Sequence, residues 1–502
     1  MTKLPNYTIP EFVGTVSDTL QHAGFEAYLV GGCVRDVIRG VDPNDWDITT
    51  NATPEDIQNL FPHTYYENTF GTVGVVIDNN DGEELPPLGE VEVTPYRLES
   101  AYSDNRHPDE VRFSQNLEDD LKRRDFRMNA IAVTLPSGER TFAKGTLVDP
   151  YEGLVDIHNS VIQAVGDPLE RFREDALRML RAVRFRAQLD FVVSKQTGEA
   201  IQELSETLQN IAFERIRDEF TKIIMSDNPK AGIELAHDLR LLKEFLPELE
   251  EGIGIDQNQA HSFDVWEHSL RALQGTADKG WATEIRLAAL LHDIGKPRTR
   301  QMDQKKNDWS FHGHEVVGAK MTRDILRRLK YQKSLECDVT KLVRWHMFFS
   351  DPDQITLSAV RRMIRNVGEE RIWDLMNLRI ADRIGTGRPK EEPYRFRKYK
   401  SMIEEVLRDP VSTKQLAVDG SDIMELTGER PGPRIGWIMH ALLEGVLDDP
   451  TRNTRDYLEK RSVELGKMDD ANLRLLGERG MEKKDAVEET AVAELRKKHH
   501  VK

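Results

Sequence analysis

Two aspartates flank a single tryptophan in the segment DPNDWDITT, residues 42–50. Asp45 and Asp47 are two positions apart, so both carboxylates would point to the same face of a strand. Two like charges at that spacing repel each other. A solvent-exposed strand edge is the simpler interpretation of such a pair. The alternative is a site for divalent cations, which prefer oxygen ligands, and the flanking sequence has to decide between them.

A pair of glycines precedes the two aspartates. The apolar run AYLV predicts a short strand that leads into Gly31 and Gly32. Glycines at that point let backbone N–H groups approach a phosphate without interference from a Cβ atom. Arg35, on the helix expected next, could bind triphosphate oxygens. This order predicts two Mg²⁺ ions on Asp45 and Asp47, one activating an attacking hydroxyl and the other neutralising a leaving pyrophosphate.

The elements that must position these groups are short strands and helices. The segments TVGVVID, GEVEVTPY and NAIAVTL, at residues 72–78, 89–96 and 129–135, have the composition or the alternation of strands. They predict an α/β head over residues 1–157. Glu92, in the second of these strands, is the candidate for a third acidic ligand. An ordinary exposed glutamate is the alternative interpretation of Glu92.

Six arginines follow the head within residues 170–186, where the apolar period is helical. An exposed helix with salt bridges is the simpler interpretation, and Glu174 would then pair with Arg178 across one turn. A more specific interpretation is base recognition. Asp175 and Arg178, three apart on one helix face, place an acceptor beside a donor. That pair matches the edge shared by cytosine and adenine and rejects guanine and uracil.

A second group of candidate ligands lies in the helical region beyond residue 253. His292 and Asp293 are adjacent, and other potential ligands fall around them in the order His268, His314, His346 and Asp382. Histidine and aspartate with open coordination positions suit a divalent transition metal or Mg²⁺ rather than a closed structural zinc site. Water activated by such a metal would attack a phosphate ester, and Lys296 could contact the phosphate. A related fold that has lost its metal is the alternative.

The composition limits the other possibilities. The chain has 502 residues, a formal net charge of −17 and 31% charged residues. This charge argues against an evenly basic nucleic-acid protein, so the arginine-rich helix would be a local basic patch. Two cysteines without a CxxC motif argue against a thiolate zinc site and favour a reducing compartment. No apolar run is long enough to span a bilayer, so we expect a cytoplasmic protein without membrane contact.

The chain as a whole is expected to divide into five parts. Beyond the head, the apolar period is helical almost throughout. We expect a helical neck, a metal-binding phosphohydrolase domain, a helical tail and a charged C-terminal extension without assigned chemistry, over residues 158–252, 253–392, 393–470 and 471–502, respectively.

Several of these motifs recur together, in the order LVGGCVRD, DWDI, RRDF, DPYEGLVD and REDALRMLRAVRF. In this order they resemble the class II tRNA nucleotidyltransferases, the CCA-adding enzymes and bacterial poly(A) polymerases of the DNA polymerase β superfamily. The resemblance covers most of the chain. It implies a polymerase β-like head with a small mixed sheet, followed by a largely all-α body. The residues at 253–392 resemble an HD phosphohydrolase domain, whose ligand pattern is complete with His268, His292, Asp293 and Asp382.

The resemblance also implies roles for individual residues. Asp45 and Asp47 would bind the catalytic Mg²⁺, and Glu174 would hold Arg178 in place. Arg127 stands where the family commonly has threonine, so its role is open. The residues that would contact the nucleotide are Gly32, Arg35, Arg124, Asn129, Glu174, Asp175, Arg178, Arg181 and Arg184.

The implied activity is the addition of CCA to tRNA 3′ ends from CTP and ATP, with contacts to the acceptor stem and elbow. The HD domain would act as a 2′,3′-cyclic phosphodiesterase or phosphatase in 3′-end repair. The segment at residues 100–126 has full length, which favours CCA over CC addition. A poly(A) polymerase or an A-adding enzyme is the close alternative. An HD phosphohydrolase whose head only binds nucleotide or RNA is the alternative from another class.

Overall fold

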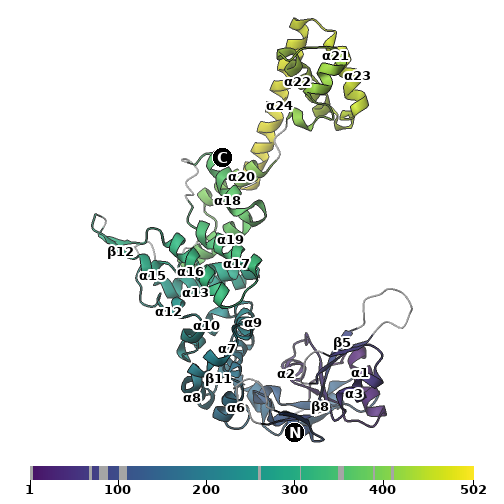
Figure 1. Cartoon of the computed structure of the whole chain (residues 1–502), viewed down its shortest axis with the longest axis vertical. Helices are drawn as coiled ribbons and strands as arrows, with labels where there is room; N and C mark the ends of the chain where they lie inside the picture. The colour runs from purple at the N-terminus through teal and green to yellow at the C-terminus, as the bar shows by residue number, and fades with distance from the viewer. Residues whose placement is uncertain are drawn as a thin grey trace. The chain divides into compact units, whose positions relative to one another are not determined.

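The computed structural model describes residues 4–66, 71–77, 89–100, 110–257, 262–305, 307–348, 355–387, 390–408 and 412–501 (Figure 1). The chain forms two compact units. The first contains residues 1–346 and 381–388, and the second contains residues 347–380 and 389–502. Both candidate sites lie in the first unit.

The head is built on a mixed sheet of seven strands in the order β3-β4-β5-β2-β1-β8-β9. Strand β2 runs parallel to β5, and the other neighbouring pairs are antiparallel. The strands predicted at residues 27–30, 72–78, 89–96 and 129–135 are confirmed as β1, β4, β5 and β8. The bounds of the seven strands in chain order are β1 Tyr28–Val30, β2 Asp47–Thr50, β3 Thr64–Tyr66, β4 Val73–Ile77, β5 Gly89–Pro95, β8 Ala132–Thr134 and β9 Thr146–Val148.

The register of the sheet brings the predicted acidic residues together. In the parallel pair β2–β5, Asp47 is opposite Glu92. Helix α2 (Gly32–Arg39) begins directly after β1, and Gly31 at the junction has φ +80°, a conformation that favours glycine. The remaining head elements are α1 Glu11–His22, α3 Pro54–Leu60, α4 Leu117–Lys122, α5 Gly153–His158, the hairpin of β6 Arg97–Ser100 and β7 Glu110–Phe113, and the 3₁₀ turns η1 Arg127–Asn129 and η2 Phe142–Lys144.

Helices dominate the rest of the first unit, as the apolar period predicted. The neck consists of α6 Pro168–Glu174, α7 Leu177–Leu189, α8 Lys195–Leu204, α9 Phe213–Ile224, α10 Pro229–Asp238, α11 Leu242–Phe245 and α12 Pro247–Glu250, with the small parallel pair β10 Val161–Ile162 and β11 Val192–Val193. The next group consists of α13 Val265–Asp278, α14 Thr283–Leu291, α15 Lys296–Thr299, α16 His314–Arg328 and α17 Lys333–Trp345, with the hairpin of β12 Gln301–Asp303 and β13 Asp308–Ser310.

The second unit is helical in all its regular elements among the described residues. Helix α22 begins with Pro433 at its first position. The charged C-terminal extension is part of a helix that packs closely on α22, with Gly477 and Gly480 in the contact. The helices are α18 Leu357–Val367, α19 Ile372–Gly385 (which ends in the first unit), α20 Tyr394–Leu407, α21 Gly420–Thr427, α22 Pro433–Asp448, α23 Arg455–Gly466 and α24 Asp470–Lys498.

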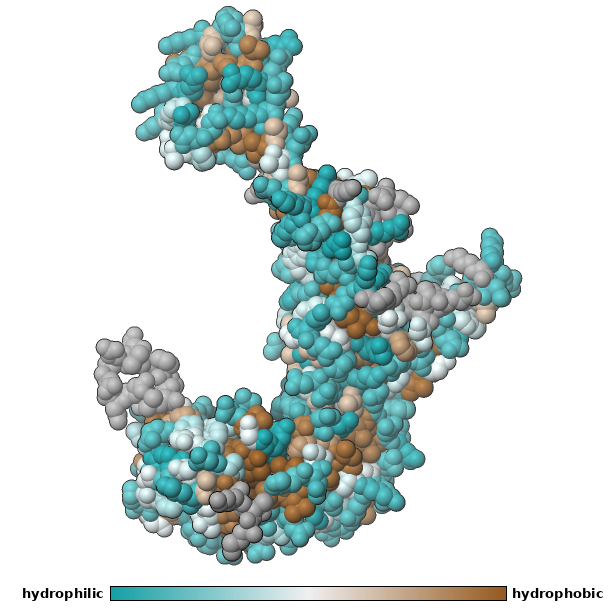
Figure 2. Space-filling model, turned by 180° about the vertical axis from the view of Figure 1, so that it is seen from behind, coloured by the Kyte–Doolittle hydropathy of each residue, from teal (hydrophilic) through white to brown (hydrophobic). Residues whose placement is uncertain are grey.

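Hydrophilic residues cover most of the face shown in Figure 2, in keeping with the high content of charged residues. Within the described part of the chain, no helix combines the length and the apolar character needed to cross a membrane.

Candidate active sites

A cavity of about 570 Å³ is lined by the head sheet, by η1 and by the neck helices α7 and α9. It brings together most of the residues predicted for the head and neck. The predicted residues that line it are Gly32, Arg35, Asp47, Glu92, Arg124, Asn129, Asp175, Arg178, Arg181 and Arg184. Asp45 and Glu174 are the two predicted residues that do not line it.

The position of Asp45 corrects one sequence-based expectation. Strand β2 begins at Asp47, so Asp45 lies in an exposed bend before the strand and the two carboxylates do not share a strand face. Among the described residues, three potential ligands lie within 4.8 Å of one another only in the helical region beyond the neck. Among the described residues, the carboxylates of the head therefore do not provide a group of three converging metal ligands by themselves. This donor set fits Mg²⁺, which is commonly held by one or two carboxylates together with substrate phosphates.

A buried carboxylate joins the head to the neck at the cavity. Asp125 accepts a hydrogen bond from Arg181 Nε at 2.7 Å and one from Asn129 Nδ2 at 3.3 Å. Asn129 in turn accepts a hydrogen bond from Arg35 Nη1 at 2.9 Å. Burial alone would raise the pKa of Asp125, but the nearby Arg181 and Arg178 outweigh it and lower the pKa to about 2. Asp125 is therefore an anion at neutral pH and fixes the orientation of two nucleotide-binding candidates.

The neck arginines come from two helices rather than from one. The sequence predicted a continuous helix over residues 170–186, but α6 ends at Glu174 and α7 begins at Leu177. Asp175 has extended backbone angles, and its carboxylate accepts a hydrogen bond from the N–H of Leu177. Aspartate interrupts helices in this way because its side chain competes for backbone N–H groups. Asp175 and Arg178 thus do not share one helix face, although both line the cavity.

The expected pair of Glu174 and Arg178 is present across this break. Arg178 Nη1 donates to Glu174 Oε2 at 2.5 Å, and Arg178 Nη2 donates to the carbonyl oxygen of Arg123 at 3.0 Å. Glu174 also pairs with Arg171. Glu174 therefore lies behind Arg178 and holds it, as the resemblance implied, while Arg178 itself borders the cavity.

Sequence reasoning missed the partner of Asp175. Arg215, on α9, donates from Nη2 to Asp175 Oδ2 at 2.7 Å and from Nη1 to Oδ1 at 3.4 Å. It lines the same cavity, together with Lys222 of the same helix. The sequence offered one signal, an arginine in the motif ERIRDEF at residues 214–220. Spacing within a helix cannot reveal a contact to a residue 40 positions away, so the sequence alone did not connect Arg215 with Asp175.

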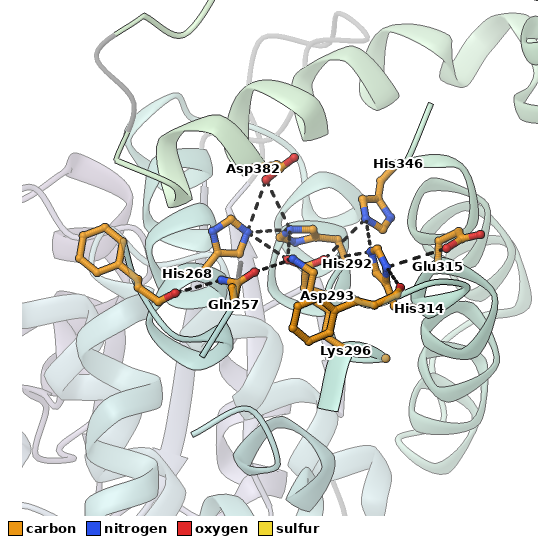
Figure 3. A network of polar contacts seen from close by, with 12 residues as sticks. Gln257, His268, His292, Asp293, Lys296, His314, Glu315, His346 and Asp382 are labelled. Atoms are coloured by element: carbon orange, nitrogen blue, oxygen red, sulfur yellow. Dashed lines mark hydrogen bonds and ion pairs between the residues drawn. The ribbon is translucent and has the colours of Figure 1, made fainter. Parts of the chain in front are cut away.

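The second site lies where α13, α14, α16, α17 and α19 meet, and Figure 3 shows its side chains. His268 is on α13, His292 and Asp293 directly follow α14, His314 begins α16 and His346 directly follows α17. All five side chains are buried. Asp382, on α19, completes the set predicted from the sequence. The structure therefore brings together every residue of the predicted metal site, including His314 and His346, which the sequence had suggested only as further candidates.

These six residues form two groups of three. His268, His292 and Asp382 offer ligand atoms within 4.8 Å of one another, and so do Asp293, His314 and His346. Within the first group the two Nε2 atoms are 3.0 Å apart, and within the second group the two Nε2 atoms are 3.2 Å apart. Convergent imidazole nitrogens and carboxylate oxygens are a donor set that fits divalent metals.

The surroundings fix the orientation of these ligands. Lys296 Nζ donates to Asp293 Oδ2 and to Gln257 Oε1, both at 2.6 Å. Burial of Asp293 would raise its pKa, but His292 and Lys296 outweigh this and hold the pKa well below its usual value. Burial lowers the pKa of His346 to about 4. A Cβ atom on Gly385 would lie 2.7 Å from the carbonyl oxygen of His268, so only glycine lets α19 approach this closely.

Three family models match the chain. "Poly A polymerase head domain" matches residues 27–163, "Probable RNA and SrmB- binding site of polymerase A" matches residues 190–253, and "HD domain" matches residues 265–386. The CCA-adding enzyme of Ligilactobacillus salivarius is 44% identical over 452 residues, which cover 90% of this chain and 95% of that protein. The chain belongs to the CCA-adding enzyme family.

Other members of the family support the same assignment. The CCA-adding enzyme of Lactobacillus helveticus is 43% identical and is covered over 98% of its length, against 92% of this chain. An A-adding tRNA nucleotidyltransferase of Deinococcus radiodurans is 34% identical, with 91% of that protein and 83% of this chain covered. The crystal structure of the Bacillus stearothermophilus CCA-adding enzyme in complex with CTP matches with a TM-score of 0.57 and 27% identity, covering 90% of this chain and 96% of that one. The predicted family, its mixed-sheet head, its helical body and its HD domain are thereby confirmed.

Proposed function

We propose that this protein adds CCA to the 3′ ends of tRNA, using CTP and ATP and releasing pyrophosphate. The observation that carries the proposal is the single cavity in which Asp47 and Glu92 face arginines of the head and neck. Its chemistry suits a triphosphate, because carboxylates can hold cations and guanidinium groups can bind phosphate oxygens. Family membership supports the same reaction. The Ligilactobacillus and Lactobacillus relatives are both named as CCA-adding enzymes.

In the proposed reaction the 3′ hydroxyl oxygen of tRNA bonds to the α-phosphorus of the nucleotide, and the bond to the bridging oxygen of the pyrophosphate breaks. Asp45, Asp47 and Glu92 would hold Mg²⁺, which when bound supplies charge neutralisation for this transfer. Asp45 would have to approach from its exposed bend. Arg35 and Arg124, beside the glycine turn, would bind the triphosphate oxygens.

Selection of the base would rest on Asp175 and Arg178. A carboxylate accepts a hydrogen bond from the exocyclic amine of cytosine or adenine, and a guanidinium donates to the neighbouring ring nitrogen. Guanine and uracil present the reverse pattern, so a mismatched base would leave buried polar groups without partners. Each such group costs about 1–3 kcal/mol. Arg181 and Arg184, further along α7, would contact the nucleotide as well.

The remaining parts of the chain would bind the tRNA. We assign the helical tail, at residues 393–470, to the elbow of tRNA and the head and neck to its acceptor stem, with recognition through backbone and shape. We further propose that the functional parts of the chain have the limits predicted from the sequence, which are residues 1–157, 158–252, 253–392, 393–470 and 471–502. The segment at residues 100–126, from which we infer CCA rather than CC addition, includes residues 101–109, which lie outside the described residues.

The test incubates the protein with tRNA that ends at the discriminator base and all four nucleoside triphosphates, and sequences the products. We expect CCA and no longer product. Addition of A only to tRNA ending in CC would identify an A-adding enzyme like the Deinococcus relative, and a long A tract would identify a poly(A) polymerase. Asp47→Ala and Asp45→Ala should each abolish transfer. His292→Ala combined with Asp293→Ala should leave transfer intact and serves as the matched control.

A second activity is favoured by the buried groups of ligands in the HD region. We propose that this region hydrolyses 2′,3′-cyclic phosphodiesters or phosphomonoesters at RNA 3′ ends. Water would bond to phosphorus, and one ring P–O bond of the cyclic ester would break to leave a monoester and a free hydroxyl. A divalent metal bound there supplies Lewis-acid activation for such hydrolysis. Lys296, which donates to Asp293 and Gln257, would also contact the phosphate.

This second proposal is tested with RNA oligonucleotides that carry a 2′,3′-cyclic phosphate, in the presence of Mg²⁺, Mn²⁺, Co²⁺ or Ni²⁺. We expect hydrolysis that the Asp45→Ala variant retains and the His292→Ala, Asp293→Ala variant loses. Hydrolysis that survives the loss of both HD residues would contradict the proposal. If the cyclic ester survives while a terminal monoester is cleaved, the region is a phosphatase.

A further inference from the structure

One wall of the nucleotide cavity holds residues that the proposed binding of nucleotide and metal leaves unused. Thr72, Thr94 and Arg97 line the cavity. Thr72 directly precedes β4, Thr94 belongs to β5 and Arg97 begins β6. These three residues are called the β4–β6 wall below. Among the described residues that line the cavity, Arg97 is the only cation that comes from neither α2, residues 123–124 nor the neck helices.

The strand order places the β4–β6 wall on the opposite side of the head carboxylates from the glycine turn. The sheet runs β4-β5-β2-β1-β8, and Asp47 on β2 is opposite Glu92 on β5. Gly31 follows β1 on one side of this pair, and β4 lies on the other side. A Cβ atom on Gly31 would lie 3.1 Å from Arg124 Nη1 and 3.3 Å from Asp47 Oδ2. The candidates for binding phosphate and metal therefore meet on the β1 side.

The alternation of β5 directs Thr94 to the same face as the metal candidate. Glu92 and Thr94 are two positions apart, so their side chains share one face of the strand. Both are half-buried, whereas Val93 between them is fully buried. Thr72 Oγ1 lies 3.4 Å from Thr94 Oγ1. One of these hydroxyls donates to the other, so the second O–H group remains a donor for a ligand in the cavity.

The geometry of phosphoryl transfer determines the side from which the RNA must enter. The attacking and leaving oxygens lie roughly in line, on opposite sides of the phosphorus. In the proposed reaction Arg35 and Arg124 hold the triphosphate on the β1 side. The attacking hydroxyl then reaches the carboxylates from the β5 side, where the β4–β6 wall lies. The RNA carries a phosphodiester anion one step behind that hydroxyl, and a guanidinium group is a suitable partner for such an anion.

We propose that the β4–β6 wall binds the last nucleotide of the tRNA. Arg97 contacts the phosphate that joins this nucleotide to the preceding one, and the threonine hydroxyls contact its ribose 2′-hydroxyl. This site is distinct from that of the incoming nucleotide; it deepens the proposed transfer reaction and rests on it. Phosphate and ribose are common to every RNA end. The same wall therefore serves an end in the discriminator base, in C or in CC.

The experiment compares normal and modified RNA ends, with ATP and a tRNA that ends in CC as substrates. In the modified tRNA a methylphosphonate replaces the phosphate between the last two nucleotides, which removes its negative charge. We expect this change to raise KM for tRNA about tenfold in the parent protein, the effect of losing one hydrogen bond between charged groups. Arg97→Ala should raise KM for unmodified tRNA by a similar factor, leave KM for ATP unchanged and no longer respond to the methylphosphonate.

Two variants separate the proposed contact from a structural role. Arg97→Lys should recover part of the response to the methylphosphonate, because it restores the charge without the planar pair of donors. Arg186→Ala is the matched control and should respond as the parent does, since Arg186 pairs with Asp190 and does not line the cavity. Thr94→Val should lose the preference that the parent shows for a terminal ribose over a terminal 2′-deoxyribose.

The parent protein alone can overturn the proposal, by showing the same KM for both forms of the tRNA. A methylphosphonate effect of equal size in the parent and in Arg97→Ala would also overturn it, as would a defect of Arg97→Ala confined to KM for ATP. An A-adding enzyme or a poly(A) polymerase would likewise extend an end in CC with ATP. Failure to build CCA on tRNA that ends at the discriminator base would therefore refute the proposed function and leave the terminal-nucleotide site standing.

Discussion

Replacing Arg215 with alanine is expected to weaken the selection of CTP and ATP over UTP and GTP. Arg215 donates to both oxygens of Asp175, at 2.7 and 3.4 Å, and the Asp175 side chain is only 16% exposed. Without this partner the carboxylate keeps only the hydrogen bond from the N–H of Leu177 to Oδ1, so Oδ2 is no longer fixed as an acceptor for the exocyclic amine of the base. Arg217 lies on the same helix but donates to Asp218 and to the carbonyl oxygen of Lys330.

The size of the effect follows from these contacts. A hydrogen bond to a charged group contributes about 1.5–3 kcal/mol. The Arg215 side chain is 30% exposed, so solvent screens its interaction with Asp175. We therefore expect removal of Arg215 to cost about 1.4 kcal/mol of transition-state stabilisation for CTP and ATP, which corresponds to about a tenfold change in rate. We therefore expect kcat/KM for CTP and ATP to fall about tenfold, while the low values for UTP and GTP change little.

The assay measures kcat/KM for each of the four nucleotides on tRNA lacking its CCA end. Arg217→Ala is the matched control and should leave the selectivity unchanged, whereas Arg215→Lys should restore part of it because lysine offers a charge but no planar pair of donors. Equal losses with all four nucleotides would refute the reasoning, since they would make Arg215 a general binding or structural residue.

Two further predictions concern stability. Gly480→Ala should lower the free energy of unfolding of the second unit by about 1–3 kcal/mol in urea, because the new Cβ atom would lie 2.1 Å from the carbonyl oxygen of His440. Gly445→Ala on the facing helix meets nothing within 4 Å and should instead gain up to about 1 kcal/mol; a loss in both variants would point to the backbone rather than to this contact. Burial raises the pKa of Asp156 from 3.8 to about 6, so the folded state binds the proton of this carboxyl more tightly than the unfolded state does. The contribution of protonated Asp156 to the free energy of unfolding is therefore fully present below pH 3.8 and is lost as the pH rises toward 6. Asp156→Asn should therefore be more stable by about 1–2 kcal/mol at pH 7 and flatten the profile of unfolding free energy between pH 4 and 6; an unchanged profile would contradict the assignment.

Much of the fold and of both sites could be predicted from the sequence, because the relevant signals are local. The strand before Gly31 and the alternation around Glu92 each depend on a few adjacent residues, and these elements formed as expected. The adjacent His292 and Asp293 likewise pointed to the group of candidate ligands that the structure brings together. The prediction of one continuous helix, which was wrong, also rested on a local signal. Residues 170–186 have a helical period, but Asp175 has extended backbone angles and its carboxylate accepts a hydrogen bond from the N–H of Leu177, so the helix is interrupted there.

The remaining features depend on contacts between distant segments, which one sequence does not reveal. Arg215 meets Asp175 only because α9 packs against α7. The division of the HD ligands into two sets likewise depends on where α16 and α17 begin and end. Asp45 shows the complementary case, since strand alternation predicts a shared face only if the strand extends that far, and β2 begins two residues later.

The carboxylate of Asp125 has a mechanical consequence for the nucleotide cavity. It belongs to the head but is bonded to Arg181 of the neck, and both groups are charged at neutral pH. This ion pair joins head and neck beside the hydrogen bond from Arg178 to the carbonyl oxygen of Arg123. Separating the two walls there would leave a charged group on each side without its partner. Any widening of the cavity that a lengthening RNA end requires should therefore leave this ion pair intact.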